Sequence, residues 1–265
     1  MFDPLKLYGT CEIPNISRQL VAGPLAVDLS GGNLRTIRFA GYEVLRSISY
    51  VVRDRDWGTY DPMVSNLRIE EEADRFAVRY DASCRAPDGV ELHFQARITG
   101  DATGRLSFRV EAETNGAFET NRCGFCVLHP IEGVAGTAAE VIHTDGSIEH
   151  SRFPDLIEPW QPFKDMRAIS HGIGGLRATC LMEGDTFEME DQRAWSDASY
   201  KTYVRPLALP WPYVIDRGKE NIQTITLTVS GDSTDIAATA LPKTAMTKIS
   251  FATPKTETMP RFGLA

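Results

Sequence analysis

Several features that would place this chain in a familiar class are missing from its sequence. No apolar run approaches the ~20 residues that a membrane-spanning helix needs. The N-terminus, MFDPLKLYGT, lacks the basic stretch and apolar core of a secretory signal, so we expect a cytoplasmic protein without a membrane partner. The net charge is −8, from 36 acidic and 28 basic residues, and no basic stripe is visible. Nucleic acid is therefore not an expected partner, because binding to phosphate backbones depends on clustered Lys and Arg.

Cysteine is scarce and odd in number, which argues against a disulfide scaffold. The five residues are Cys11, Cys84, Cys123, Cys126 and Cys180. Most lie in apolar surroundings, as reduced thiols of cytosolic proteins do. Cys123 and Cys126 have the spacing of a zinc or redox motif, but the second pair that a zinc ribbon needs is missing. Residues three apart face opposite sides of a strand, so we interpret both thiols as structural.

Common catalytic motifs are also missing. There is no Gly-x-Ser-x-Gly elbow and no His-Glu-x-x-His helix, so a serine α/β-hydrolase and a zincin are not supported. The glycines within 172–175 are followed neither by Gly-Lys-Ser/Thr nor by a helical pattern, so we do not expect a phosphate loop. Helical periodicity is weak throughout, and its best case is the short segment 196–203.

Alternation of apolar and polar residues is plentiful, and it is the signature of half-buried strands. It recurs in the segments 34–41, 43–54, 75–84, 90–100 and 104–114, which are separated by turn sequences. With 265 residues the chain can bury a large core. We therefore predict a mainly β protein, an antiparallel β-sandwich in which two packed sheets each bury one face.

The remainder of the chain is less regular. The segment 123–136 reads as a buried strand ending at His129, and a further strand is predicted within 221–230 and another within 247–252. Three prolines in 153–164 exclude a regular helix or central strand there, so we predict a long loop that caps a binding face. We assign residues 1–252 to the sandwich domain and 253–265 to a linker toward a further C-terminal domain.

The densest cluster of chemistry-bearing residues lies between Phe187 and Tyr203. Charges of both signs stand there among aromatic rings, as in pockets for polar small molecules. Glu188 and Glu190 share one face of a strand by alternation, and two neighbouring carboxylates suit acid–base chemistry. A plain ion-pair network, in which Arg193 and Lys201 neutralise the carboxylates, is the alternative.

Two histidines are candidates for acid–base chemistry. His129 ends a buried strand shortly after Arg122, and His143 flanks Asp145 in a polar turn, where a carboxylate can orient an imidazole. By contrast, His93 alternates with apolar residues on a strand, and we interpret it as structural or exposed.

Several segments form a distinctive set, namely NRCGFCVLHP (121–130), HTDGS (143–147), QPFKD (161–165) and, most specifically, FEMEDQR (187–193) with DASYKTY (197–203). Together they resemble the D-apionate lactonases, bacterial enzymes of apiose breakdown. The resemblance implies hydrolysis of a sugar lactone, D-apionolactone, to D-apionate, with a TIM-barrel-like domain after the β-rich N-terminal region. It also implies a fold similar to the galactose-mutarotase β-supersandwich.

Lactone hydrolysis needs a base for water, donors for the oxyanion and an acid for the departing ring oxygen, and it requires no cofactor. From the residues alone, we expect these roles to fall to Glu190 or Asp191 as base, Arg193 and Lys201 as electrostatic stabilisers, and His129 or His143 as acid. We expect the substrate-binding wall to include Trp195, Tyr200, Tyr203, Asp145 and Arg122. We expect no metal.

Two other functions fit the same residues. An aldose 1-epimerase would use a proton-transfer pair such as His129 and Glu190 to open and close a hemiacetal. A noncatalytic carbohydrate-binding or dimerisation domain would instead serve a separate barrel.

Overall fold

The computed structural model describes residues 5–6, 9, 11, 16–195 and 198–231. Strands dominate this part of the chain, and their bounds are β1 (Ser17–Ala22), β2 (Leu25–Ser30), β3 (Asn33–Phe39), β4 (Tyr42–Arg53), β5 (Met63–Glu71), β6 (Arg75–Arg85), β7 (Glu91–Asp101), β8 (Arg105–Thr114), β9 (Phe118–Thr120), β10 (Arg122–Pro130), β11 (Ala138–His143), β12 (Ile148–Arg152), β13 (Met166–Ile173), β14 (Leu176–Glu183), β15 (Phe187–Asp191), β16 (Ser199–Val204), β17 (Tyr213–Ile215) and β18 (Asn221–Ser230). Helical structure within the same ranges is limited to short turns such as η1 (Gln192–Ala194), and none of them has the length or apolar composition to cross a bilayer.

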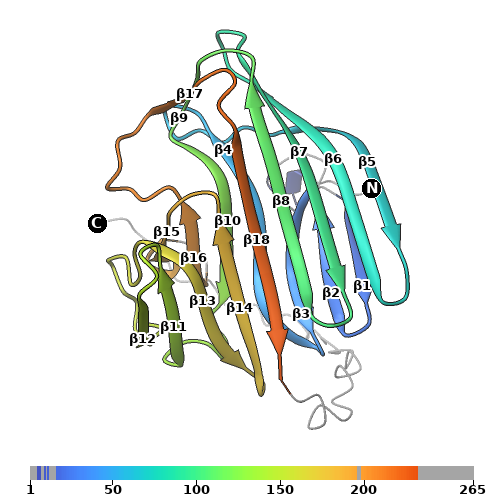
Figure 1. The fold of residues 1–265 in the computed structure, drawn as a ribbon, viewed down its shortest axis with the longest axis vertical. Helices are drawn as coiled ribbons and strands as arrows, with labels where there is room; N and C mark the ends of the chain where they lie inside the picture. Colours follow the sequence, from blue (N-terminus) through green and yellow to red (C-terminus); the bar gives the residue numbers. More distant parts are fainter. Residues whose placement is uncertain (1–4, 7–8, 10, 12–15, 196–197, 232–265) are drawn as a thin grey trace, which may run out of the picture.

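One continuous antiparallel sheet forms both layers of the sandwich. Its hydrogen-bonded order is β1-β2-β3-β4-β10-β16-β15-β13-β14-β18-β8-β7-β6-β5, and the β11–β12 hairpin joins it at β13. The sheet curls over itself, so that β6, β7, β8 and β18 lie in front of β1 to β4 in Figure 1. The hydroxyl of Tyr80 on β6 donates to the carbonyl of Gly32 between β2 and β3, 2.8 Å away, and so ties the two layers together.

The two ends of this strand order meet along one flank. Strand β1 contacts β5 and β6 without pairing with either of them. Arg18 of β1 forms an ion pair with Glu71 of β5, and both side chains are partly exposed. The curled sheet is therefore closed at this seam by side chains, without a ladder of backbone hydrogen bonds.

Most of the strand predictions are confirmed. The five alternating segments correspond to β3, β4, β6, β7 and β8, and the segment 221–230 is β18. The weak helical periodicity of 196–203 gives no helix in the part that the structure describes, because β16 begins at Ser199 and pairs on both sides, with β10 and β15. Pairing on two sides outweighs a weak local preference. The predicted strand in 247–252 and the linker at 253–265 lie outside the described residues.

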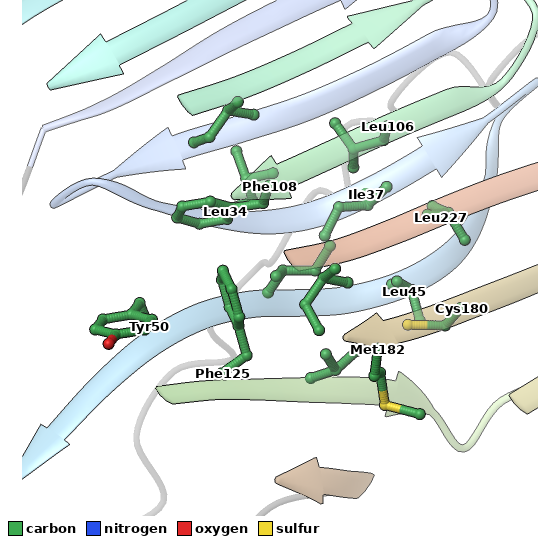
Figure 2. Packing of buried hydrophobic residues seen from close by; sticks show 14 of the residues in the cluster. Leu34, Ile37, Leu45, Tyr50, Leu106, Phe108, Phe125, Cys180, Met182 and Leu227 are labelled. Atoms are coloured by element: carbon green, nitrogen blue, oxygen red, sulfur yellow. The ribbon is translucent and has the colours of Figure 1, made fainter. Parts of the chain in front are cut away.

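A single apolar core fills the space between the two layers. Phe108 of β8 and Phe125 of β10 meet with ring centroids 4.9 Å apart, and Tyr50 of β4 lies against Phe125 at 5.3 Å. Figure 2 shows these rings with Leu34 of β3 and Leu227 of β18, so that side chains from both layers meet in one cluster. Alternation along each strand supplies these inward-facing residues.

A buried amide joins the layers beside this core. The side chain of Gln223 on β18 donates to the carbonyl of Cys123, 3.0 Å away, and accepts from the backbone N–H of Phe125 at 3.1 Å. Gly124 lies between these two residues, and a Cβ there would come within 2.3 Å of the Gln223 Oε1 atom. The Cys-Gly-Phe-Cys segment thus serves close packing, and both of its cysteines are free thiols.

Replacing Gln223 by Leu should destabilise the fold, because a buried N–H and a buried C=O would lose their partner. We expect the free energy of unfolding to fall by about 2–4 kcal/mol, measured by denaturant titration. Gln95→Leu, on the exposed face of β7, is the matched control and should change it by no more than about 0.5 kcal/mol. Equal effects of the two substitutions would refute this role for Gln223.

Candidate active site

The block with the strongest family resemblance forms two neighbouring strands, β15 and β16. Glu190 lies directly opposite Lys201, and Glu188 lies opposite Tyr203. On its other edge β16 pairs with β10, where Tyr203 faces Cys126. Residues directly opposite each other share a face of a sheet. The expectation that Glu188 and Glu190 share a strand face is therefore confirmed.

We call the side of β4, β10, β16 and β15 that faces away from the core the outer face. Inward-facing neighbours such as Val52, Val127 and Met189 are fully buried in the core. Alternation therefore turns the intervening residues outward. The polar members of the outer face include Arg53, Arg122, Cys126, Glu188, Glu190, Lys201 and Tyr203.

An ion pair occupies the middle of the outer face. The Lys201 Nζ atom contacts the Glu190 carboxylate, and the two side chains keep 18% and 19% of their surface exposed. The pair is thus in contact with solvent while being sheltered from it on most sides. A half-buried Lys–Glu pair offers a proton acceptor and a cationic hydrogen-bond donor at one place.

Tyr203 links this pair to a second charged group. Its ring lies 5.4 Å from Lys201 Nζ and 4.0 Å from the guanidinium carbon of Arg122. Its hydroxyl donates to the buried carboxylate of Glu188 at 2.7 Å, which also accepts from the N–H of Leu207 at 2.8 Å. Burial, reinforced by the bond to Glu188, raises the pKa of Tyr203 well above its ordinary value. Tyr203 is therefore a neutral hydrogen-bond donor.

Arg122 is the most deeply buried cation of the outer face, with 6% of its surface exposed. Its Nε atom has no acceptor, and its guanidinium is stacked on the ring of Tyr203, with the Trp57 ring centroid 5.5 Å away. Burial lowers its pKa, an effect that the nearby Glu190 partly offsets and Arg53 enhances. Arg53 is its direct partner on β4.

Cys126 lies among the same charges. Burial raises the pKa of its thiol, and the cations of Lys201 and Arg122 offset that rise only in part. The thiol is therefore protonated at neutral pH, which does not favour nucleophilic attack.

Asp191 and Arg193 serve another part of the structure. Asp191 lies on the opposite face from Glu190, and its carboxylate accepts from Arg193 Nε at 2.9 Å and Nη2 at 2.7 Å. Arg193 also donates to the carbonyls of Pro154 at 3.0 Å and Asp155 at 2.8 Å. Burial would raise the pKa of Asp191, but hydrogen bonds from Arg193 and the Glu158 N–H outweigh it and hold the pKa below its ordinary value.

These two residues, with Tyr200, hold the proline-containing segment 153–164 against the sheet. Tyr200 is fully buried, and its hydroxyl donates to the Pro154 carbonyl. Trp195, at the end of η1, is 74% exposed. The segment contains no regular strand, as predicted. Asp191, Arg193 and Tyr200 are thus engaged by a loop, whereas Glu190 and Lys201 lie on the outer face.

Arg193→Met should loosen this loop, because the buried carboxylate of Asp191 would lose its cationic partner and keep only backbone N–H donors. We expect the free energy of unfolding to fall by about 3–5 kcal/mol and proteolysis within 153–164 to accelerate. Arg177→Met removes an exposed ion pair with Glu140 and, as the control, should cost no more than about 1 kcal/mol. Unchanged stability and proteolysis of the Arg193 variant would count against this anchoring role.

His129 lies on the core side of β10, remote from the outer face by alternation. Its Nε2 atom is 2.9 Å from the Thr202 hydroxyl, whereas its Nδ1 atom has no partner. Burial, aided by the neighbouring His171, lowers its pKa to about 3, and burial lowers the pKa of His171 to about 4. The backbone of Val44 offsets part of the shift of His171, although neither of that ring's nitrogens makes a hydrogen bond of normal geometry.

Two buried neutral imidazoles make the fold sensitive to acid. Their folded pKa values lie below the unfolded value near 6.5, so their contribution is complete above that pH and is lost as pH falls toward 4. Between pH 7.5 and 5.5 each should cost about 1.4 kcal/mol of unfolding free energy. Denaturant titrations across this range should show a slope that His171→Gln reduces by about half. An unchanged slope in this variant would contradict the assignment.

His143 is the last residue of β11, and Asp145 lies in the turn between β11 and β12. His143 Nδ1 is 2.9 Å from the Lys164 carbonyl and Nε2 is 3.2 Å from Glu149. Asp145 accepts from the Ser147 N–H at 2.8 Å and from its hydroxyl at 2.6 Å, and these bonds lower its pKa. These hydrogen bonds stabilise the turn itself and connect it to the segment that ends at Lys164.

The structure therefore distributes the residues expected in one pocket over separate places. The outer face brings together Glu190, Lys201, Tyr203 and Arg122. It adds Arg53, which sequence reasoning missed although it is the last but one residue of the alternating segment 43–54. Alternation predicts on which face of β4 the Arg53 side chain lies, but only the pairing register with β10 shows that Arg53 is opposite Arg122.

Hollows also occur on the far side of the sandwich. One of about 820 Å³ lies over β6, β7 and β8, and is lined by residues that include Asp81, His93, Gln95, Glu111 and Glu113. These side chains are mostly exposed, and none has a buried atom without a partner. We place the candidate site on the outer face, where buried charges and the family-like block coincide.

Residues 5–232 match the family model described as D-apionate lactonase, N-terminal domain. The chain belongs to the D-apionate lactonase N-terminal domain family. A D-apionate lactonase from Brucella anthropi is 56% identical to it over 229 residues. That match covers 86% of this chain but 38% of the relative, so this family member spans well under half of the relative's length.

Solved structures with the same architecture are distant in sequence. A GalM/aldose epimerase homologue from C. elegans superposes with a TM-score of 0.54 at 9% identity, over 82% of this chain and 99% of the other. A galactose 1-epimerase from Lactobacillus acidophilus NCFM gives 0.53 at 8% identity, over 82% and 95%. These likenesses show the fold alone, and they confirm the expected galactose-mutarotase-like β-sandwich.

Proposed function

We propose that this chain is the N-terminal part of an enzyme that hydrolyses D-apionolactone to D-apionate, with no cofactor. The observation that supports this most strongly is the 56% identity to a D-apionate lactonase over most of the chain. The outer face adds chemistry that suits the reaction, since a half-buried carboxylate and ammonium lie beside a neutral phenol.

We infer that Glu190 and Lys201 act directly on the lactone. Glu190 accepts a proton from a water molecule as its oxygen attacks the lactone carbonyl. Lys201 donates a hydrogen bond to the oxyanion of the tetrahedral intermediate. When the ring C–O bond breaks, the proton held by Glu190 passes to the departing ring oxygen, which becomes the new hydroxyl. The carboxylic acid that forms releases its proton to solvent.

This proposal uses part of the residue set expected from the sequence. The acid role expected for His129 or His143 falls to Glu190, because those imidazoles lie in the core and beside a hairpin turn. Tyr203 and Arg122 form the wall beside the reacting groups.

Glu190→Gln and Lys201→Met should each lower kcat/KM for D-apionolactone by about 100-fold or more in the longest natural form of the protein. Acid release at constant pH measures the rate. Glu111→Gln is the control, because Glu111 forms an exposed ion pair with Arg109 on β8, away from the outer face. We expect it to change kcat/KM by less than about threefold. If both outer-face variants stay within that range, the residues do not take part in bond cleavage. A higher KM with unchanged kcat would assign them to binding alone.

A further inference from the structure

Two arginines face each other on the outer face without a carboxylate between them. Arg53 of β4 and Arg122 of β10 are direct partners across adjacent strands, so their backbones are only about 5 Å apart. Like charges in this position are destabilising. The Nε atoms of both are buried without an acceptor, and Arg53 donates to the Trp57 carbonyl at 2.9 Å. Neither side chain forms an ion pair with any described residue.

The carboxylates around them already have partners. Glu190 is paired with Lys201, and Glu188 accepts from Tyr203 and Leu207. Asp54 accepts from two backbone N–H groups of its own turn, at 2.8 and 2.7 Å. The two neighbouring guanidinium groups therefore have no carboxylate partner among the described residues, although Arg122 is only 6% exposed. Such an arrangement is costly unless a ligand supplies the charge.

Aromatic rings fix the plane of the buried guanidinium. The Arg122 Cζ atom lies 4.0 Å from the ring centroid of Tyr203 and 5.5 Å from that of Trp57. Trp57 is itself held by Trp211, with ring centroids 5.3 Å apart. Stacking of this kind occupies the faces of a guanidinium group. Its N–H groups, which lie in the guanidinium plane, remain available for bidentate hydrogen bonds to a carboxylate.

We propose that Arg53 and Arg122 form a binding site for the carboxylate of a small polyhydroxylated acid. The choice of acid rests on the proposed function, because hydrolysis converts a neutral lactone into such a carboxylate beside these arginines. The site then holds the product more tightly than the neutral substrate. D-apionate should accordingly inhibit the reaction competitively.

The test is titration calorimetry on the longest natural form of the protein, with D-apionate and the neutral sugar D-apiose as probes. D-apionate should bind at least 10-fold more tightly than D-apiose. Arg53→Gln and Arg122→Gln should each weaken D-apionate at least 10-fold and leave D-apiose within threefold. Arg122→Lys, which keeps the charge without the planar fork, should give an intermediate loss.

The matched control is Arg97→Gln, because Arg97 also faces another arginine, Arg109, but on an exposed strand face. It should bind D-apionate like the parent protein. Thermal denaturation of each variant separates loss of binding from loss of fold. Unchanged D-apionate affinity in a folded Arg122→Gln variant would overturn the proposal, as would equally tight binding of inorganic phosphate.

Hydrolysis and anion binding can fail separately in these experiments. If Glu190→Gln keeps full activity while D-apionate binding depends on Arg122, the carboxylate site stands and the assignment of the reacting groups does not. If hydrolysis depends on Glu190 but the arginine variants bind D-apionate normally, the carboxylate site is refuted alone.

Discussion

The pairing of β16 with β10 on one edge and β15 on the other is the constraint on which the candidate site depends. This double pairing brings Glu190, Lys201 and Arg122 to one face, although 68 residues separate the first from the last by their numbers. A shift of one residue in either register would turn every side chain of that strand to the opposite face. The inward positions are filled by Val127, Met189 and other core residues, so the same apolar packing that stabilises the sandwich also fixes where the charges point.

Local patterns in the sequence were enough to predict the strands but not their partners. Alternation located β4 and β8 nearly to the residue, since it depends only on which side chains avoid water. The Arg53–Arg122 contact depends on pairing between distant segments, which no local pattern contains. The same holds for Asp191, which is adjacent to Glu190 in sequence and yet lies on the opposite face because successive strand residues alternate. Resemblance to a family marked the right block without distinguishing its outward residues from its inward ones.

The proline-containing segment 153–164 shows a second limit of sequence reasoning. Its prolines correctly excluded a regular strand. Its position over the core, however, depends on Arg193 and Tyr200, whose side chains donate hydrogen bonds to the Pro154 carbonyl. Phe153 of this segment packs against His129 and Tyr200. A loop of this kind is stabilised by side-chain donors that replace a strand ladder. The charges of the block thus have two separate purposes, one in holding a loop and one on the outer face.

The seam between β1 and β5 has consequences for how the molecule responds to salt. Most neighbours in the strand order are joined by ladders of backbone hydrogen bonds, but at the seam no ladder joins β1 to β5, and an exposed ion pair links Arg18 to Glu71. Exposed ion pairs contribute at most about 1 kcal/mol and are screened by salt. The contribution of this ion pair therefore falls as ionic strength rises. The flank then depends on the bond from the Gly23 N–H to the Ala73 carbonyl, 3.1 Å long, and on the buried side chains between the layers.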